Sequence, residues 1–383
     1  MSRDAEEPNG LLEQFQSLVA SVSGIDGTGD LSLDLTLKAA GDKLGQLIHV
    51  LAVPHWFGAE AVRIVAGDQQ FGDDPESLLN EVLRMPWVRV HPLGFVYHDE
   101  IRGKLRDALL RHQSERFREI CRLLRVHVDE LLDRTHHEGR IDSDTSLRRA
   151  ELRRERVYLT LGYSESEGIV QLEQEFGLAR REKLINAADD LIQMAREQSS
   201  LLSPSGRARI DLCSALLAFD SRDWDGAIRM LSGLNLDVLP RECVNRALLH
   251  QGMALERSGR WSEAKAFYLN RNFRRRVGGA KQDPITQAKV HQRLAEVYFA
   301  SRDLKRAESA GVRSLKLNQT SGDRLGEAIN LRFLGIIREK LHDTKEATAL
   351  LMRSLSLFEE LKLDGDAAKV CEFPVSLHEY CRA

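Results

Sequence analysis

The sequence predicts an all-α protein whose C-terminal part is a solenoid of stacked helical hairpins. Charged residues make up 30% of the 383 residues and aromatic residues only 6%. This balance is typical of helical proteins with much surface and not of β-sandwiches. The second observation is an internal repeat, beginning near residue 207, with the spacing of paired helices. At this length we expect two or three compact units.

Residues 1–34 are predicted to form a short helix followed by a flexible linker. Apolar residues recur at helical spacing in Leu11, Leu12, Phe15, Leu18 and Val19. The tract SGIDGTGD then combines three glycines with small polar residues, which favours irregular backbone.

Residues 35–117 are predicted to form three helices, a hairpin and a further helix. The elements are helices over 35–54, over 56–67 and from Pro75, a hairpin turning at Pro92, Leu93 and Gly94, and a helix from about Asp99. Proline at the first position of the third helix supports its start there, because its missing N–H has no partner in a first turn anyway. Three helices followed by a two-stranded wing predict a winged-helix domain.

Two flanking segments extend this pattern. HDEIRGKLRDALL follows the hairpin, and VYLTLGYSESEGIVQLEQEFGLARREKLINAADDLIQMA precedes the repeat. Together with the predicted winged helix, they resemble the C-terminal half of bacterial signal-transduction NTPases with numerous domains, the STAND proteins. The resemblance implies a helical arm over residues 118–206. It also implies a regulatory role in bacterial signalling or antiviral defence.

The sequence departs from such NTPases in one respect that decides mechanism. No phosphate-binding G-x-x-x-x-G-K-[ST] motif occurs, and the nearest glycine cluster, GDKLG at residues 41–45, lies inside a helical pattern and lacks the lysine–hydroxyl pair. We therefore expect no nucleotide hydrolysis and no cofactor. The chain is the regulatory half of a split system, a part of a longer protein, or a stand-alone relative.

The strongest signal is a small residue that recurs twelve positions before an alanine. The four pairs are Ala215 with Ala227, Gly252 with Ala264, Ala295 with Ala307, and Gly335 with Ala347. Small residues at these two places are typical of tetratricopeptide hairpins, whose helices approach closely there. The second alanines are 37, 43 and 40 residues apart, more than the usual period of about 34, so helices or loops must be longer. The predicted fold is thus a winged-helix domain, a helical arm and a tetratricopeptide-like α-solenoid over residues 207–383.

In tetratricopeptide hairpins, ligand-facing residues lie on the first helix at fixed offsets from the small residue. The offsets are six and three before it, and one, four and five after it. They select a partner-binding groove with a basic rim and an apolar floor. Its predicted residues are Arg209, Arg246, Met253, Arg257, Lys289, Gln292, Phe299, Arg332, Ile336 and Lys340. This combination suits an acidic or phosphorylated peptide with apolar side chains for the floor.

A basic stretch, NRNFRRRV, falls in the long connection between the second and third hairpins. It contains Arg271, Arg274, Arg275 and Arg276, with Phe273 between them and no acid nearby in sequence. We expect it to be solvated. It is also the best candidate outside the groove for contact with nucleic acid or an acidic partner.

The net charge of −3 hides an uneven distribution. Residues 1–100 contain sixteen Asp and Glu against six Lys and Arg, a net charge of −10, so residues 101–383 carry +7. The third helix of the predicted winged helix and its approach hold Asp73, Asp74, Glu76 and Glu81 against Arg84 alone. Because such a helix repels phosphates, we expect the winged helix not to bind DNA.

Catalytic and metal-binding patterns are missing from the sequence. It has no G-x-S-x-G and no catalytic cysteine signature, so we expect no enzyme activity. His127, Asp133, His136, His137 and Glu138 are close in sequence but enter a turn region without a third fixed ligand, and we assign no metal. Five scattered cysteines favour reduced thiols. A polar N-terminus and no long apolar run predict a cytoplasmic protein without membrane contact.

These observations predict a non-catalytic regulatory or sensor protein that recognises an acidic protein or peptide partner through its repeats. Two other classes remain open. One is a nucleic-acid-binding transcriptional regulator or RNA sensor that uses the winged helix or the basic stretch. The other is an accessory subunit of a protease or ATPase complex.

Overall fold

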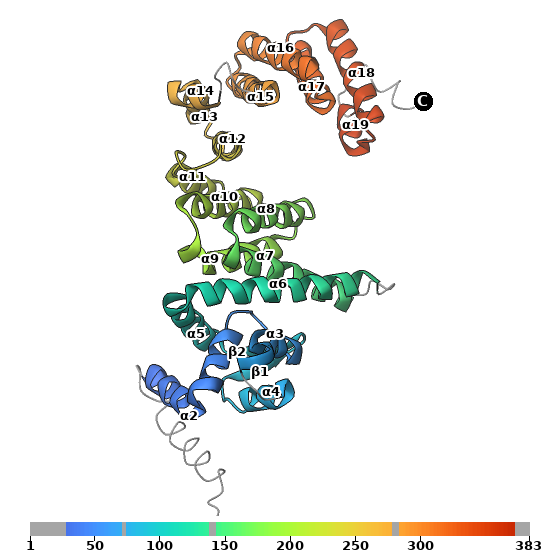
Figure 1. The fold of residues 1–383 in the computed structure, drawn as a ribbon. Coiled ribbons are helices and arrows are strands. Elements are labelled where there is room, and N and C mark those ends of the chain that lie inside the picture. The colour runs from blue at the N-terminus through green and yellow to red at the C-terminus, as the bar shows by residue number, and fades with distance from the viewer. Residues whose placement is uncertain (1–27, 71–73, 138–142, 278–282, 372–383) are drawn as a thin grey trace, which may run out of the picture. The chain divides into compact units, whose positions relative to one another are not determined.

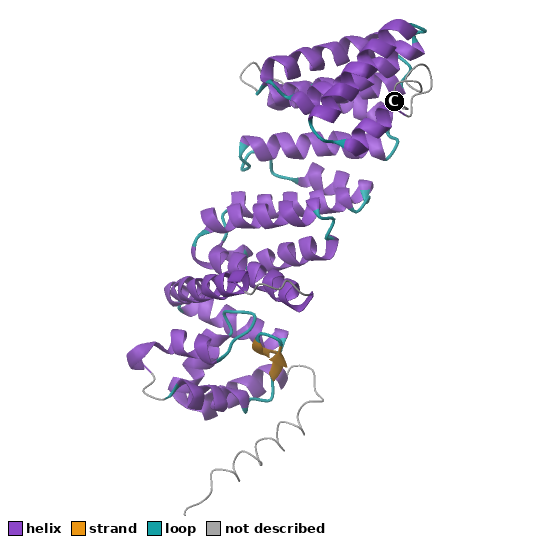
Figure 2. Cartoon of the chain, turned by 90° about the vertical axis from the view of Figure 1, so that its right-hand side faces the viewer, coloured by secondary structure: helices purple, strands orange, loops and turns teal. Residues whose placement is uncertain are grey.

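A computed structural model describes residues 28–70, 74–137, 143–277 and 283–371. These residues are predominantly helical, with one two-stranded sheet among them (Figures 1 and 2), which confirms the predicted fold class. The chain divides into two compact units. The described residues up to Glu175, with Glu197–Leu201, form the N-terminal unit; Phe176–Arg196 and the described residues from Leu202 form the repeat unit.

The N-terminal unit follows the predicted order of helices and hairpin. Its elements are α2 (Thr28–Leu51), α3 (Ala59–Gln70), α4 (Pro75–Leu83), β1 (Val88–His91), β2 (Gly94–Tyr97), α5 (Asp99–His112), α6 (Ser114–His137), α7 (Ser143–Tyr163), the start of α8 (Glu165–Arg181) and the short 3-10 helix η1 (Ser199–Leu201). Helix α2 starts inside the tract that was expected to be a linker, and residues 1–27 lie outside the described part of the chain.

The hairpin is tied to the loop before α3. Phe57 and Phe95 exchange two backbone hydrogen bonds of 2.8 Å each, which adds a bridge beside β2. Gly94 has φ +141°, and a side chain there would overlap the carbonyl oxygen of Phe57, so the close approach requires glycine. The buried rings of Phe57 and Tyr97 meet edge to face with centroids 4.9 Å apart.

The repeat unit contains the four predicted hairpins. Its elements are the rest of α8, α9 (Ile185–Glu197), α10 (Pro204–Asp220), α11 (Trp224–Gly233), α12 (Arg241–Arg257), α13 (Trp261–Leu269), α14 (Arg271–Val277), α15 (Pro284–Ala300), α16 (Leu304–Ser321), α17 (Arg324–Lys340), α18 (Thr344–Glu360) and α19 (Asp364–Cys371). The extra length relative to a common repeat lies in α14 and in the second helices α16 and α18, which have 18 and 17 residues against 10 in α11.

The small residues of the template lie where first and second helices touch, as predicted. The four alanines of the second helices are all buried, with exposed fractions between 0% and 4%. A side chain at Gly252 would overlap the ring of Tyr268, and one at Gly335 would come within 2.7 Å of Leu351. The two hairpins with a glycine therefore place a larger second-helix side chain over it.

The turns inside three of the four hairpins share one local cause. Arg222, Arg302 and His342 adopt left-handed backbone, with φ of 64°, 60° and 63°, and an aspartate follows each of them. That aspartate accepts a backbone N–H of the next helix, as Asp223 does from Gly226 at 2.9 Å. A left-handed residue that ends one helix and an N-cap that starts the next produce a tight reversal.

The same turn joins α8 to α9. Lys183 there has φ 59°, and Ala188, five residues later, is fully buried. In the four predicted hairpins the second-helix alanine also lies five residues after the left-handed residue. Residues 176–196 accordingly belong to the repeat unit, although the sequence analysis assigned them to the helical arm.

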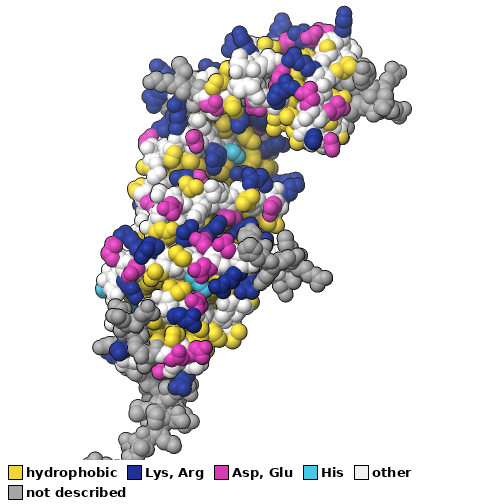
Figure 3. Space-filling view, turned by 45° about the vertical axis from the view of Figure 1, so that its right-hand side comes forward, with side chains coloured by type: hydrophobic (Ala, Val, Ile, Leu, Met, Phe, Trp, Pro, Cys, Tyr) yellow, Lys and Arg dark blue, Asp and Glu magenta, His cyan; other side chains and the backbone are white. Residues whose placement is uncertain are grey.

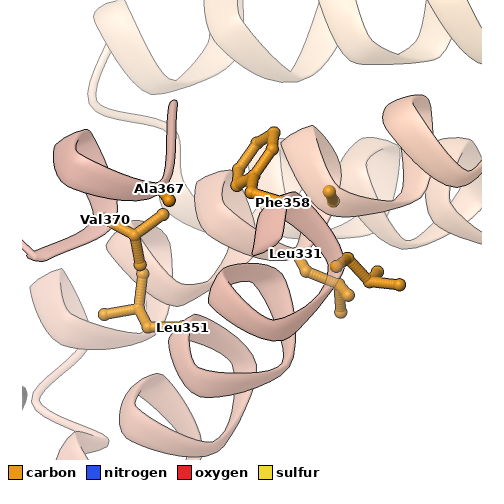
Figure 4. Packing of buried hydrophobic residues seen from close by; sticks show 7 residues of the cluster. Leu331, Leu351, Phe358, Ala367 and Val370 are labelled. Carbon is orange, nitrogen blue, oxygen red and sulfur yellow. The ribbon is translucent and has the colours of Figure 1, made fainter. Parts of the chain in front are cut away.

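Helix α19 packs against the last hairpin. Leu331 of α17, Leu351 and Phe358 of α18, and Ala367 and Val370 of α19 form one buried cluster (Figure 4). Terminal helices of this kind protect the apolar end of a helical repeat array from water.

Candidate functional site

The predicted groove residues all lie on the first helices of the hairpins, α10, α12, α15 and α17. Arg246, Arg257, Lys289 and Lys340 are exposed there. The other six are half-buried: Arg209, Met253, Gln292, Phe299, Arg332 and Ile336. We call the positions selected by the offsets on these four helices the first-helix face. In Figure 3 a hollow of the repeat unit shows hydrophobic side chains with basic side chains beside them.

Consecutive first helices touch through one repeated pair of positions. The residue four after one small residue meets the residue two before the next small residue. The three pairs are Phe219 with His250, whose rings lie 5.2 Å apart, Glu256 with Arg293, an ion pair of 3.4 Å, and Phe299 with Phe333, whose rings lie 5.5 Å apart. The offset of four thus contributes to helix–helix packing, and Phe299 has a structural partner.

Two other predicted residues have partners inside the chain. Arg332 lies 3.8 Å from Asp366 of α19 and stacks over the ring of Phe358, with 5.6 Å from its guanidinium carbon to the ring centre. Gln292 donates a hydrogen bond of 3.3 Å to Glu296. The exposed bases that remain for an external partner are therefore fewer than the sequence offsets selected.

The acids of the first-helix face are mostly paired. Asp220 forms an ion pair with Arg180. Glu296 pairs with Arg293 at 2.7 Å. Glu256 accepts the Tyr268 hydroxyl at 2.6 Å and is 5% exposed; burial raises its pKa, against the opposing effects of Arg293 and of that hydrogen bond.

The exposed bases of the same face have no such partners. Arg246, Arg257, Lys289 and Lys340 form no ion pair with any residue that the structure describes. Arg246 and Lys289 stand six residues before their small residues, and Arg257 and Lys340 stand five after theirs. Eleven residues complete about three turns, or roughly 16 Å of helix. The bases therefore flank the floor at both ends of the first helices.

The basic stretch forms a short helix instead of an open loop. Within α14, Phe273 is 3% exposed and packs against Phe267 and Tyr268, with ring centroids 5.1 and 5.3 Å apart. The one aromatic side chain between the arginines is therefore buried. Arg276 pairs with Asp237 at 2.7 Å, while Arg271, Arg274 and Arg275 are exposed.

A polar network in the N-terminal unit escaped the sequence analysis. His55, before α3, donates a hydrogen bond of 2.7 Å from Nδ1 to Glu155 Oε2, and its Nε2 lies 3.4 Å from Glu197 Oε1. Arg102 and Arg106 of α5 donate to the other oxygen of Glu197 at 2.9 and 2.6 Å. The network links the loop after α2 with α5, α7 and the end of α9.

Opposite charges in this network raise the pKa of His55 and lower the pKa of Glu197. Burial lowers the pKa of His55, but Glu155 and the hydrogen bonds to both carboxylates outweigh it, so the pKa is raised. Burial raises the pKa of Glu197, but His55 and Arg102 lower it by more, so that the pKa falls to about 2. Arg102 also donates to the carbonyl oxygens of Pro54 and Val53 at 3.1 and 3.3 Å. No sequence signal connects these residues, because 100 and 142 positions separate His55 from its two carboxylates.

The glycine cluster of residues 41–45 lines an open cavity of about 650 Å³ between α2, α5 and α6. Gly41 has φ 75° and ψ 169°, which breaks α2 at this point. His49, His112 and Arg116 line the other walls. The lysine–hydroxyl pair of a phosphate loop is missing from the motif itself.

Other expected absences concern the part of the chain that the structure describes. There, no three His, Cys, Asp or Glu side chains gather as a metal site. Glu138 and the side chains of His136 and His137 lie outside it. Every helix within the described ranges is too short or too polar to cross a membrane.

Three solved structures have a similar course of the chain. BtubC from P. vanneervenii aligns with a TM-score of 0.49 and 17% identity, over 58% of this chain and 93% of that one. A STAND protein with a tetratricopeptide repeat sensor from Pyrococcus horikoshii aligns with a TM-score of 0.45 and 13% identity, over 96% of this chain and 55% of that one. The apo form of RapI aligns with a TM-score of 0.42 and 11% identity, over 74% of this chain and 70% of that one.

Sequence comparison adds one family. No curated protein matches the chain in sequence. Residues 286–360 match the family model described as tetratricopeptide repeat. This range runs from the first turn of α15 to the end of α18. The third and fourth predicted hairpins are therefore tetratricopeptide repeats, which generally bind protein partners.

Proposed function

We propose that this chain is a non-catalytic regulatory or sensor protein that binds an acidic segment of a protein partner on the first-helix face. The observation that supports the proposal is the charge asymmetry of this face. Three of its four acids, Asp220, Glu256 and Glu296, are paired within the chain. Its four exposed bases have no ion pair among the described residues. Unpaired cations beside apolar floor residues favour a peptide with carboxylates and apolar side chains.

A bacterial signalling or antiviral-defence setting is part of the proposal and rests on the resemblance to STAND proteins. A winged-helix domain over residues 35–117 is also proposed. It is supported by the order of α2, α3 and α4, the β1–β2 hairpin, and the bridge between Phe57 and Phe95. In this proposal, the N-terminal unit transmits or restrains what the repeats detect.

The partner can be located with a matched pair of methionines. Met253 lies half-buried on the first-helix face, and Met230 of the second helix α11 is 46% exposed. A photo-crosslinking amino acid is placed at either position in the full chain, in cells of the native host. We expect one protein to be captured from Met253 and not from Met230. Capture of the same protein from Met230 alone would contradict the proposal.

The rim is then tested by charge reversal with the captured partner. The groove variant carries Arg246→Glu, Arg257→Glu and Lys289→Glu. It should slow association at least about tenfold, because rim charges act mainly on the encounter rate.

A reference variant has the same net charge. It carries Arg229→Glu, Arg241→Glu and Lys345→Glu. These three residues are exposed and are not among the positions of the first-helix face. It should associate within about twofold of the parent chain. Equal slowing of both variants would mean that net charge, and not the first-helix face, governs binding.

A further inference from the structure

The positive charge of the chain is concentrated in one short segment. Residues 271–321 hold twelve Lys and Arg against four Asp and Glu, a net charge of +8. The whole of residues 101–383 carries only +7. This segment therefore accounts for the entire positive net charge of residues 101–383, which follow the acidic N-terminal part in the sequence. It comprises α14, α15 and α16.

The four acidic side chains of this segment already have partners within the chain. Asp283 and Asp303 cap the N-termini of α15 and α16 by accepting the backbone N–H of Thr286 and Arg306. Glu296 pairs with Arg293, and Glu308 pairs with Arg338. Asp303 also pairs with Arg306 at 3.4 Å. Among the described residues, no carboxylate of the segment pairs with Arg271, Arg274, Arg275, Arg313 or Lys316.

Helix α14 buries apolar residues on one side and exposes arginines on the other. Phe273 and Val277 are buried at 3% and 0% exposure and anchor the helix on the second hairpin. Arg274 and Arg275 follow Arg271 by one turn, on the side away from these two residues, and all three arginines are exposed. They take part in no ion pair with a described residue.

Helix α16 continues the basic surface. Arg313 and Lys316 are exposed on it, and Val312 beside them is 50% exposed. Helix α15 lies between and packs against both α14 and α16. Burial lowers the pKa of His291 on α15, and the guanidinium groups of Arg313 and Arg274 lower it further. Because α15 packs against both α14 and α16, the exposed bases of these two helices lie on neighbouring elements.

This surface is separate from the first-helix face. His291 follows Lys289 by two residues, which turns a side chain by roughly 200° around the helix axis. Lys289 belongs to the first-helix face, so His291 points to the other side of α15. A partner could occupy both surfaces at once.

We propose that Arg271, Arg274 and Arg275 of α14 with Arg313 and Lys316 of α16 form a second docking surface, the outer basic surface, for a carboxylate-rich protein segment. Guanidinium groups match carboxylates with two parallel hydrogen bonds. A single-stranded nucleic acid would need an aromatic platform for its bases. Phe273, the one aromatic residue of α14, is buried. Val312 offers an apolar contact instead.

The test uses the full chain and a fluorescently labelled peptide of Asp and Glu with interspersed Leu. The outer variant carries Arg274→Glu, Arg275→Glu and Arg313→Glu. To isolate this surface, these changes are introduced into the groove variant as well as into the parent chain. The groove variant should still bind the peptide, and adding the outer changes should weaken that binding at least about tenfold. Because the proposal does not rest on the first-helix face, either surface can fail alone.

Matched controls keep the result interpretable. The reference variant has the same net charge as the outer variant and should bind the peptide within about twofold of the parent. Equal weakening in both variants would overturn the proposal. Tighter binding of a DNA duplex or a single-stranded RNA than of the peptide, at the same salt concentration, would also overturn it. If the outer variant does not fold, as judged by circular dichroism, the corresponding three Arg→Gln changes replace it, with the same expectation.

Discussion

Glu197 joins three groups of the N-terminal unit, so its replacement by glutamine tests the polar network directly. The amide keeps the volume of the side chain but removes its charge. It leaves Arg102, which is 7% exposed, without its ionic partner. Arg106 and the Nε2 atom of His55 lose the same partner.

The size of the effect follows from the pKa of Glu197. Its fall from 4.5 to about 2 corresponds to roughly 3 kcal/mol in favour of the charged form, at about 1.4 kcal/mol per pH unit. The side chain is 32% exposed, so solvent screens the interaction. We therefore expect Glu197→Gln to destabilise the N-terminal unit by about 1–2 kcal/mol at neutral pH.

The effect depends on pH with a defined sign. The folded-state pKa of Glu197 is lowered, so its contribution is present above the unfolded value of 4.5 and is lost as the pH falls toward about 2. The folded-state pKa of His55 is raised, so its contribution is present below 6.5 and is lost as the pH rises through the folded value. The network should stabilise the N-terminal unit most between pH 4.5 and 6.5, where both contributions are present.

Hydrogen exchange resolved by segment is the suitable assay, because a chain with two units need not unfold in one step. Amides of α5 and α7 should exchange faster in Glu197→Gln than in the parent, by roughly fivefold to thirtyfold near neutral pH. The difference should persist down to about pH 4.5 and shrink as the pH falls from there toward about 2. Glu81→Gln on the exposed surface of α4 is the control and should change nothing. A difference that stays the same from neutral pH down to about pH 2 would refute the reasoning.

Three further predictions concern other parts of the chain. Gly252→Ala should destabilise the repeat unit by about 1–3 kcal/mol because its methyl group overlaps the Tyr268 ring, whereas Gly177→Ala, with open space around it in α8, should stabilise it by about 0.5–1 kcal/mol; equal thermal shifts would contradict this. The purified chain should bind no ATP in calorimetry, since it has no phosphate loop, and saturable binding would disprove it. The N-terminal unit should not bind duplex DNA, because α4 is acidic; tight binding that Arg84→Ala and Arg89→Ala abolish would show the opposite.

The sequence determined by itself those features that depend on local pattern. The spacing of twelve between small residue and alanine located four hairpins, because every hairpin must solve the same close packing within one stretch of chain. The turn chemistry of Pro92 to Gly94 located β1 and β2 for the same reason. The first-helix offsets also placed the candidate residues on the correct helices.

The sequence pattern did not predict the hairpin of α8 and α9, and this has a physical reason. The hairpin of α8 and α9 turns at Lys183, as other hairpins turn at Arg222, Arg302 and His342, and left-handed backbone is not visible in residue types that seldom adopt it. At the start of this hairpin the small first-helix residue is replaced by Phe176. Without that small residue, the spacing of twelve did not separate this hairpin from the arm.

Only the tertiary structure decided which charged residues are available. The offsets selected Arg332 together with the exposed bases, and Arg276 lies in the same basic stretch as Arg274. Contacts with other parts of the chain nevertheless engage Arg332 with Asp366 and Arg276 with Asp237. Phe273 is anchored by rings of the preceding hairpin. The network of His55, Glu155 and Glu197 spans up to 142 positions. Periodicity records which side of its own helix a residue occupies; the partner on another helix depends on how the helices pack, which no local pattern contains.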